Sequence, residues 1–216
     1  DNGFFLKKGG LEICRKDDDA RWEELKRKVS SGKAFGTNVS LISAAEAKEK
    51  FPLLDEESIR GAMWDPDAGL VTPRSQDVVS FAVETAKDKG ALRTFTDTPA
   101  VDFEVENDRI VGVKTDKGTI KTNKVVIASG IWGPLMGKKA GVPVPLMPLE
   151  HPLLFFGPLP EAQGAEDFLV YPLLRDQGNS AYVRDTGRLH GGMLEWGFYE
   201  DINPRLVDPE DIGNPE

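Results

Sequence analysis

The stretch whose residue types most clearly suggest a ligand-binding role is KVVIASGIWG, at residues 124–133. A β-branched apolar run there breaks off into Ala128, Ser129 and Gly130, which carry almost no side chain. Two interpretations stay open: small residues permit a tight turn from a strand into a helix, and they also let a large flat ligand lie against bare backbone. Trp132, just beyond, belongs either to that ligand surface or to the core.

Few side chains could move protons or bind a carboxylate. The chain has two histidines, His151 and His190, and imidazole is the side chain whose charge changes near neutral pH. Tyr182 could add a hydroxyl group, and Arg175 and Arg184 could bind a carboxylate in principle. Residue types alone leave plainer alternatives open. The histidine and the tyrosine could be polar core residues whose hydrogen bonds are satisfied within a sheet, and the arginines could form salt bridges in a hairpin.

Composition excludes several classes of function. The 36 acidic and 27 basic side chains give a net charge of −9, whereas a nucleic-acid partner needs concentrated Lys and Arg. No apolar run approaches the roughly 20 residues needed to span a bilayer. The single cysteine, Cys14, can form no internal disulfide and lacks zinc-site spacing. We therefore expect no nucleic acid, membrane or metal, and a reducing compartment, either the cytoplasm or, in a eukaryote, the mitochondrial matrix.

The periodicity of apolar residues predicts an α/β (α+β) fold with a mixed sheet. Helical spacing predicts helices at residues 20–29 and 75–90, and the capping-box pattern from Ser43 to Glu46 predicts a short helix between them. The pattern alternates from residue 94 to residue 128, and the strands it predicts at residues 100–105, 110–115 and 119–121 form an antiparallel β-meander. Later strands are expected at three places: residues 145–156, residues 168–174, and a hairpin that joins 181–184 to 190–196.

The run at residues 125–127 has no polar alternation, so we expect a strand buried on both faces, as parallel strands are. The carboxyl end of such a strand is where open α/β folds bind dinucleotides. Those folds normally hold the pyrophosphate with a G-x-G-x-x-G turn, whose backbone amides point at the phosphates. No such turn occurs in these 216 residues.

Four features together resemble the D-amino-acid-oxidase (DAO) superfamily of FAD-dependent oxidoreductases, and within it the dimethylglycine and sarcosine dehydrogenases and oxidases. They are GGLEI at residues 9–13, GAMWDPDAGLVTP at 61–73, the meander that runs into VVIASGIW at 125–132, and PLEH at 148–151 followed by LRD at 174–176 and YVR at 182–184. Their order and spacing cover nearly the whole chain, which makes the resemblance fairly specific.

The resemblance implies three regions. Residues 1–74 would be the N-terminal part of a substrate-binding region, and residues 143–216 would be the remainder of its sheet. Residues 75–142 would supply a helix, the meander and the flavin-facing strand of a partial FAD-binding, Rossmann-like domain.

The resemblance also assigns the candidate site residues. His151 matches the active-site histidine of the family, and Tyr182 matches a tyrosine whose hydroxyl could hold the substrate carboxylate or position His151. FAD would lie against small residues at the end of the flavin-facing strand, with one loosely aligned contact near the adenine. The implied cofactor contacts are Ala128, Ser129, Gly130, Trp132 and, for the adenine, Ala100, with Ser129 standing where the family more commonly has Ala.

The implied activity is oxidation of a small amine or amino-acid substrate, an N-methylated glycine that loses a methyl group by way of an iminium ion. In the family an N-terminal segment carries the FAD fingerprint, so we expect this chain alone neither to bind FAD tightly nor to turn over. Its partner would then be the missing flavin-domain segments or a complementary subunit. Two alternatives remain: a non-catalytic interaction or regulatory homologue of the same superfamily, and an inactive lone fragment with an exposed apolar face.

Overall fold

The computed structural model describes residues 3–199 and 205–212, which form two compact units. Residues up to 85 and from 151 to 202 make the first unit, and residues 86–150 and 203–216 make the second. Helix α3 (Ser75–Asp88) begins in the first unit and ends in the second. Across the described residues, no helix has both the length and the hydropathy needed to cross a membrane.

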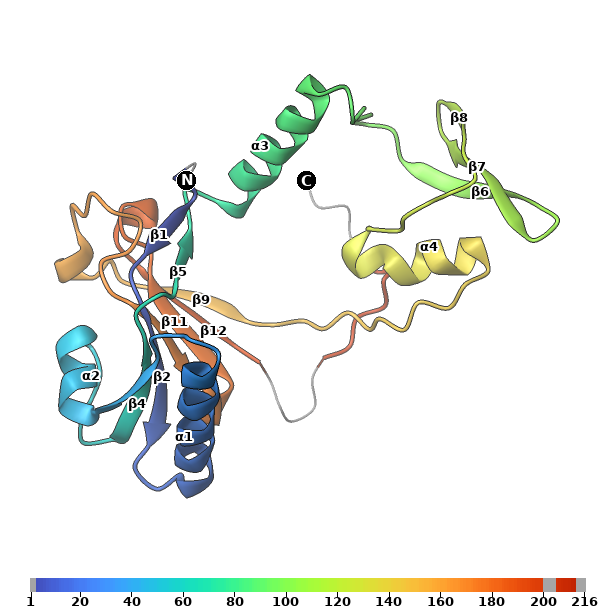
Figure 1. Cartoon of the computed structure of the whole chain (residues 1–216). Coiled ribbons are helices and arrows are strands. Elements are labelled where there is room, and N and C mark those ends of the chain that lie inside the picture. Colours follow the sequence, from blue (N-terminus) through green and yellow to red (C-terminus); the bar gives the residue numbers. More distant parts are fainter. Residues whose placement is uncertain (1–2, 200–204, 213–216) are drawn as a thin grey trace. The chain divides into compact units, whose positions relative to one another are not determined.

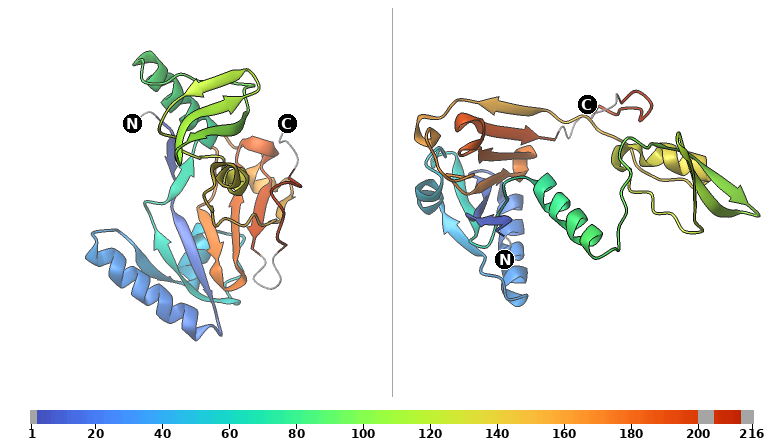
Figure 2. Two further views of the ribbon diagram at one scale, coloured as in Figure 1. Left: turned by 90° about the vertical axis from the view of Figure 1, so that its right-hand side faces the viewer. Right: turned by 90° about the horizontal axis from the view of Figure 1, so that it is seen from above.

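A seven-stranded mixed sheet in the order β3-β4-β2-β10-β11-β12-β9 forms the first unit, and Figures 1 and 2 show its last strands running alongside β2. Its one parallel pair is β2 with β10, and all other neighbours are antiparallel. A separate pair joins the short strands β1 and β5. The strands are β1 (Phe5–Lys7), β2 (Gly10–Arg15), β3 (Ser40–Ser43), β4 (Ile59–Asp65), β5 (Gly69–Val71), β9 (Leu153–Phe156), β10 (Leu173–Asp176), β11 (Ala181–Asp185) and β12 (Leu194–Phe198).

Two helices cover opposite faces of this sheet near β2 (Figure 1). Helix α2 (Ala44–Lys50) starts at the predicted capping box, in which Ser43 and Glu46 exchange hydrogen bonds. It packs on the apolar face, where the core gathers Leu11 and neighbouring side chains. Helix α1 (Asp19–Ala34) lies on the other face, where its Lys28 binds Glu12 at 2.7 Å. Both faces of β2 are therefore buried, one under α2 with the main core cluster and the other under α1.

The predicted hairpin is confirmed as β11 and β12, and a buried carboxylate fixes the segment beside it. Asp185 is fully buried, and its carboxylate accepts backbone N–H groups from Val170, Tyr171 and Gly187 at 2.8, 2.8 and 2.9 Å. These bonds tie residues 169–171, which include the buried Leu169, to the end of β11. Short 3₁₀ turns also occur at η2 (Pro160–Ala162), η3 (Gln177–Asn179) and η4 (Leu189–Gly191).

The second unit contains the predicted meander, β6 (Ala100–Glu106), β7 (Arg109–Thr115) and β8 (Gly118–Lys121), with Phe103 buried. The 3₁₀ turn η1 (Gly130–Trp132) leads into α4 (Gly133–Ala140), which packs against β6.

One predicted element of this unit is wrong. Residues 125–127 form no strand, and Val126 is 88% exposed. An apolar run becomes a buried strand only where other strands pair with it on the sheet, and no strand among the described residues does so.

The helix predicted at residues 75–90 is confirmed as α3, which ends just before Gly90 at φ 67°. Its apolar stripe is not covered, however. None of its described side chains is buried, and Val79 is 61% exposed.

Replacing Asp185 by Ala should lower the free energy of unfolding by about 3 kcal/mol, because three backbone N–H groups would lose their acceptor in a buried setting. Urea unfolding followed by tryptophan fluorescence measures this change. Asp17→Ala is the matched control, since the Asp17 side chain is exposed on the same unit. Equal midpoints for the two variants would contradict the tethering role of Asp185.

Candidate active site

Three ring side chains, one in a strand and two just beyond the ends of neighbouring strands, lie in a row on the sheet of the first unit. The His151 imidazole, just before β9, meets the Tyr199 ring edge-on with 4.6 Å between centroids. Tyr199, just after β12, lies 5.9 Å by centroids from Tyr182 of β11. The two residues that the sequence proposed as catalytic are therefore brought together by a third that the sequence analysis missed.

Strand register explains the row. Tyr182 pairs with Gly197, and Gly197 pairs with Leu153, so side chains two residues beyond Gly197 and two before Leu153 share the face of Tyr182. These are Tyr199 and His151. The Tyr199 N–H extends the ladder by donating to the Ser180 carbonyl at 2.9 Å. Alternation along the strand gives Tyr199 the same face as Gly197, but only the pairing of Gly197 with Tyr182 places Tyr199 beside the site.

The Tyr182 ring lies directly over Gly197. A Cβ atom at residue 197 would overlap both the ring and the hydroxyl of Tyr182, so any other residue there would displace the phenol. Burial raises the pKa of the Tyr182 phenol, and Tyr199 and Glu195 raise it further, while Arg184 lowers it. Tyr182 therefore stays protonated at neutral pH and presents an O–H donor.

The two arginines near Tyr182 differ in their partners. Arg184 donates to the Glu195 carboxylate at 2.6 Å, which confirms the salt bridge expected in the hairpin. Arg175 forms no ion pair with any described residue, so the same expectation is wrong for Arg175. Arg175 and Tyr182 are opposite each other in β10 and β11, and both line a cavity of about 110 Å³ with Tyr199 and Ser180.

The residues proposed to contact the cofactor lie in the second unit. Ala128 and Gly130 are exposed, Trp132 is half-buried, and Gly130 has φ 55°. The Ser129 hydroxyl is buried without a hydrogen-bond partner among the described residues. The backbone of residues 125–128 makes no hydrogen bond within the described chain either. Ala100 is exposed at the start of β6.

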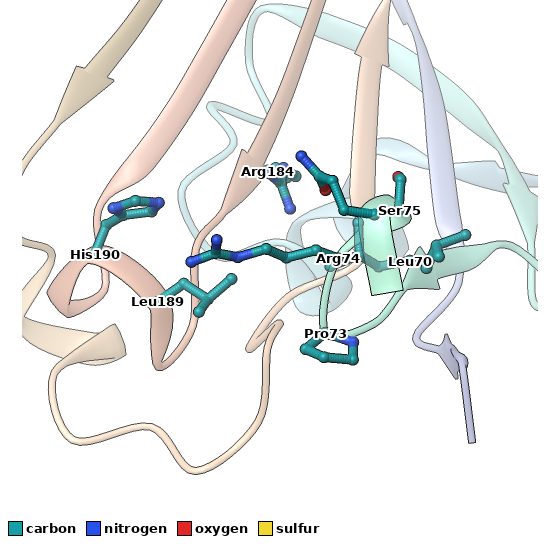
Figure 3. A pocket seen from close by; sticks show the side chains of 9 residues that line it. Leu70, Pro73, Arg74, Ser75, Arg184, Leu189 and His190 are labelled. Carbon is teal, nitrogen blue, oxygen red and sulfur yellow. The ribbon is translucent and has the colours of Figure 1, made fainter. Parts of the chain in front are cut away.

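A different pocket of the first unit, of about 390 Å³, holds the other histidine (Figure 3). Figure 3 shows Arg74 reaching from the start of α3 toward Leu189, with His190 across from it. Arg184 also lines this pocket, but its charge is engaged by Glu195. Neither His151 nor Tyr182 belongs to it, so the two histidines occupy separate surroundings.

The sequence profile of the FAD dependent oxidoreductase (DAO) family matches residues 2–214. The chain belongs to this family. The solved structure of L-proline dehydrogenase from P. horikoshii is similar, with a TM-score of 0.74 and 32% identity, over 88% of this chain and 48% of that chain.

Among curated relatives of this DAO-family chain, mitochondrial sarcosine dehydrogenase of Homo sapiens is 31% identical over 93% of the chain and 21% of its own length. Mitochondrial dimethylglycine dehydrogenase of Rattus norvegicus is 27% identical over 91% and 22%. The mitochondrial pyruvate dehydrogenase phosphatase regulatory subunit of Mus musculus is 27% identical over 94% and 22%. The chain thus spans about a fifth of the length of these relatives.

The packing of Tyr182 on Gly197 predicts how the pKa of the Tyr182 phenol responds to substitution. Tyrosinate absorbance recorded through alkaline pH should show contributions above the usual value of 10 from both Tyr171 and Tyr182, and Tyr182→Phe should remove only the second of them. Gly197→Ala should displace the phenol of Tyr182 into solvent and bring its contribution down toward 10, because the burial that raises its pKa is lost. Gly178→Ala is the control, since a Cβ there makes only ordinary contacts. A titration that Gly197→Ala leaves unchanged would contradict this packing.

Proposed function

We propose that the protein containing this chain is an FAD-dependent oxidoreductase of N-methylated glycines such as dimethylglycine and sarcosine. The observation that carries the proposal is the row of His151, Tyr199 and Tyr182 on one face of the sheet. The sarcosine and dimethylglycine dehydrogenases among the relatives support the substrate class. Bound FAD supplies the electron acceptor, so the chain itself has to bind, orient and deprotonate the amine.

Each side chain of the row has a distinct task in this proposal. His151, in its neutral form, accepts a proton from the substrate ammonium, because only an amine with a free lone pair can be oxidised. Tyr182 donates its O–H to the substrate and keeps its own proton at neutral pH, since burial raises the pKa of the phenol. Tyr199 stands between them, fixes their spacing by ring contact and shields the bound amine from water.

The second unit has groups that fit the edge of a flavin. A buried hydroxyl without a partner at Ser129, and a run of backbone N–H and C=O groups at residues 125–128, need hydrogen bonds from outside the described chain. A flavin ring edge offers alternating donors and acceptors. We assign Ala128, Ser129, Gly130 and Trp132 to this contact, and Ala100 to the adenine end.

A non-catalytic role is the second candidate, because a relative of similar identity is a regulatory subunit of a phosphatase. In this alternative the chain is an interaction module of the same fold. Oxidation of an N-methylated glycine by the flavin-loaded protein separates the two candidates.

We also propose a reducing compartment, either the cytoplasm or the mitochondrial matrix. Cys14 is fully buried, and burial raises the pKa of its thiol, with Asp18 adding to the effect. The thiol therefore stays protonated and out of reach of a disulfide partner.

The isolated 216-residue chain should not retain FAD. Its sequence contains no G-x-G-x-x-G turn to hold the pyrophosphate, and exposed backbone at one flavin edge gives too few contacts for tight binding. Gel filtration after incubation with excess FAD, read by flavin absorbance in the protein peak, measures retention. A yellow protein peak would contradict the expectation.

In the flavin-loaded protein that contains this chain, His151→Asn should lower kcat/KM for dimethylglycine about a hundredfold or more, because the proton acceptor is lost. Flavin bleaching under anaerobic conditions measures the reductive step. His190→Asn is the matched control, since His190 lies in the other pocket. Equal rates for both variants would remove His151 from the active site, and no bleaching in the unchanged protein would favour the non-catalytic role.

A further inference from the structure

The pocket of about 390 Å³ in the first unit shares no residue with the row of ring side chains (Figure 3). None of the nine described residues that line it is acidic, and three of them are basic: Arg74, Arg184 and His190. These three come from separate segments, which are the residue before α3, strand β11 and the turn η4. Basic groups from distant parts of the chain therefore gather in this pocket without an acid among them.

Arg74 brings a positive charge that nothing in the described part of the chain balances. Its guanidinium forms no ion pair, hydrogen bond or ring contact with a described residue. The charge of Arg184 is balanced by Glu195 at 2.6 Å, yet that bond uses one of the five N–H donors of a guanidinium. His190 adds an imidazole N–H, which is present whether the ring is neutral or charged. The pocket thus offers several donors and one unbalanced positive charge.

A buried threonine anchors each side of the pocket. The hydroxyl of Thr186 donates to the Leu189 carbonyl at 2.6 Å, which fixes the turn that carries His190. On the other side, the backbone N–H of Thr72 donates to a carbonyl of the N-terminal segment at 2.9 Å and so anchors the chain that leads to Arg74. A site that is fixed before binding loses little conformational entropy when a ligand enters.

The placement of the donors favours a phosphoryl group. Arg74, Arg184 and His190 lie on different sides of the pocket in Figure 3. A carboxylate is planar with two oxygens, whereas a phosphoryl group has three acceptor oxygens and a charge close to −2, so it can accept from several directions at once. Leu70 and Leu189 add apolar surface, and the volume falls within the usual range of small-molecule sites.

We propose that this pocket binds a small phosphate monoester, with the three basic side chains around the phosphoryl oxygens and the apolar body of the ligand against Leu70 and Leu189. Arg74 contributes most to the affinity, because its charge has no counter-charge among the described residues. The inference does not rest on the amine oxidation proposed for the row. It gives the protein a second ligand, a phosphorylated one.

Calorimetric titration of the flavin-loaded protein with phenyl phosphate tests the site. Phenyl phosphate should bind, and phenol, which has the same ring without the phosphoryl group, should not. Arg74→Gln should weaken the binding of phenyl phosphate about tenfold or more, the range expected for losing hydrogen bonds to a charged group. Arg74→Lys should restore part of the affinity, because it returns the charge without the guanidinium fork. Inorganic phosphate should bind more weakly than phenyl phosphate, since it has no apolar body to bury.

Arg27→Gln is the matched control, because Arg27 is an exposed arginine of α1 that does not line the pocket. It should change the affinity for phenyl phosphate less than about twofold, since exposed charges far from the ligand are screened by salt. Equal losses in Arg74→Gln and Arg27→Gln would mean that the anion responds only to net charge, and would overturn the inference. Phenylacetate that binds as tightly as phenyl phosphate would overturn the choice of a phosphoryl group. No binding of phenyl phosphate to the unchanged protein overturns the inference directly.

Discussion

The register of four neighbouring strands is the constraint on which the candidate site depends. Antiparallel pairing of β10, β11, β12 and β9 sets Arg175 opposite Tyr182 and Tyr182 opposite Gly197. A slip of one residue in any pair would turn its side chains to the other face of the sheet. The missing side chain at Gly197 then allows the phenol to lie flat on β12. The arrangement of the candidate site residues is thus a consequence of backbone pairing.

The opposite face of the same strands stabilises that register. Leu174 and Val183, each one residue away from Arg175 or Tyr182, are buried in the core with Leu11 and α2. Burial of a Leu or Val side chain contributes about 1.5–3 kcal/mol, and a slipped register would expose all of them. The hydrophobic face therefore fixes which residues lie on the face of the candidate site. Core residues and candidate site residues alternate along the same strands.

Much of this could be predicted from the sequence where the signal is local. The capping box at Ser43, the helix that ends before Gly90, the meander and the hairpin all depend on neighbours in the chain. The strand expected at residues 125–127 was wrong, because a buried strand needs partners that a local apolar run cannot reveal. The exposed stripe of α3 is a similar case. In both places the apolar residues indicate only a surface that favours burial, and they do not indicate which element would bury it.

The candidate site could be predicted only in part, because some of its residues belong to sequence motifs and others are placed by strand pairing. The family resemblance indicated His151 and Tyr182, and the structure adds that both contact one tyrosine. Tyr199 follows a hairpin strand without a motif of its own, so only register identifies it. The contrast between Arg184 and Arg175 depends on which acids are already engaged in three dimensions. Residue type alone could not separate them.

A crystal structure of the flavin-loaded protein with dimethylglycine, the flavin kept reduced so that no turnover occurs, tests the central claim most directly. The account predicts the ligand within hydrogen-bond distance of the Tyr182 hydroxyl, with its nitrogen toward His151. A ligand bound beside His190, or on the sheet face that carries Leu174 and Val183, would contradict it.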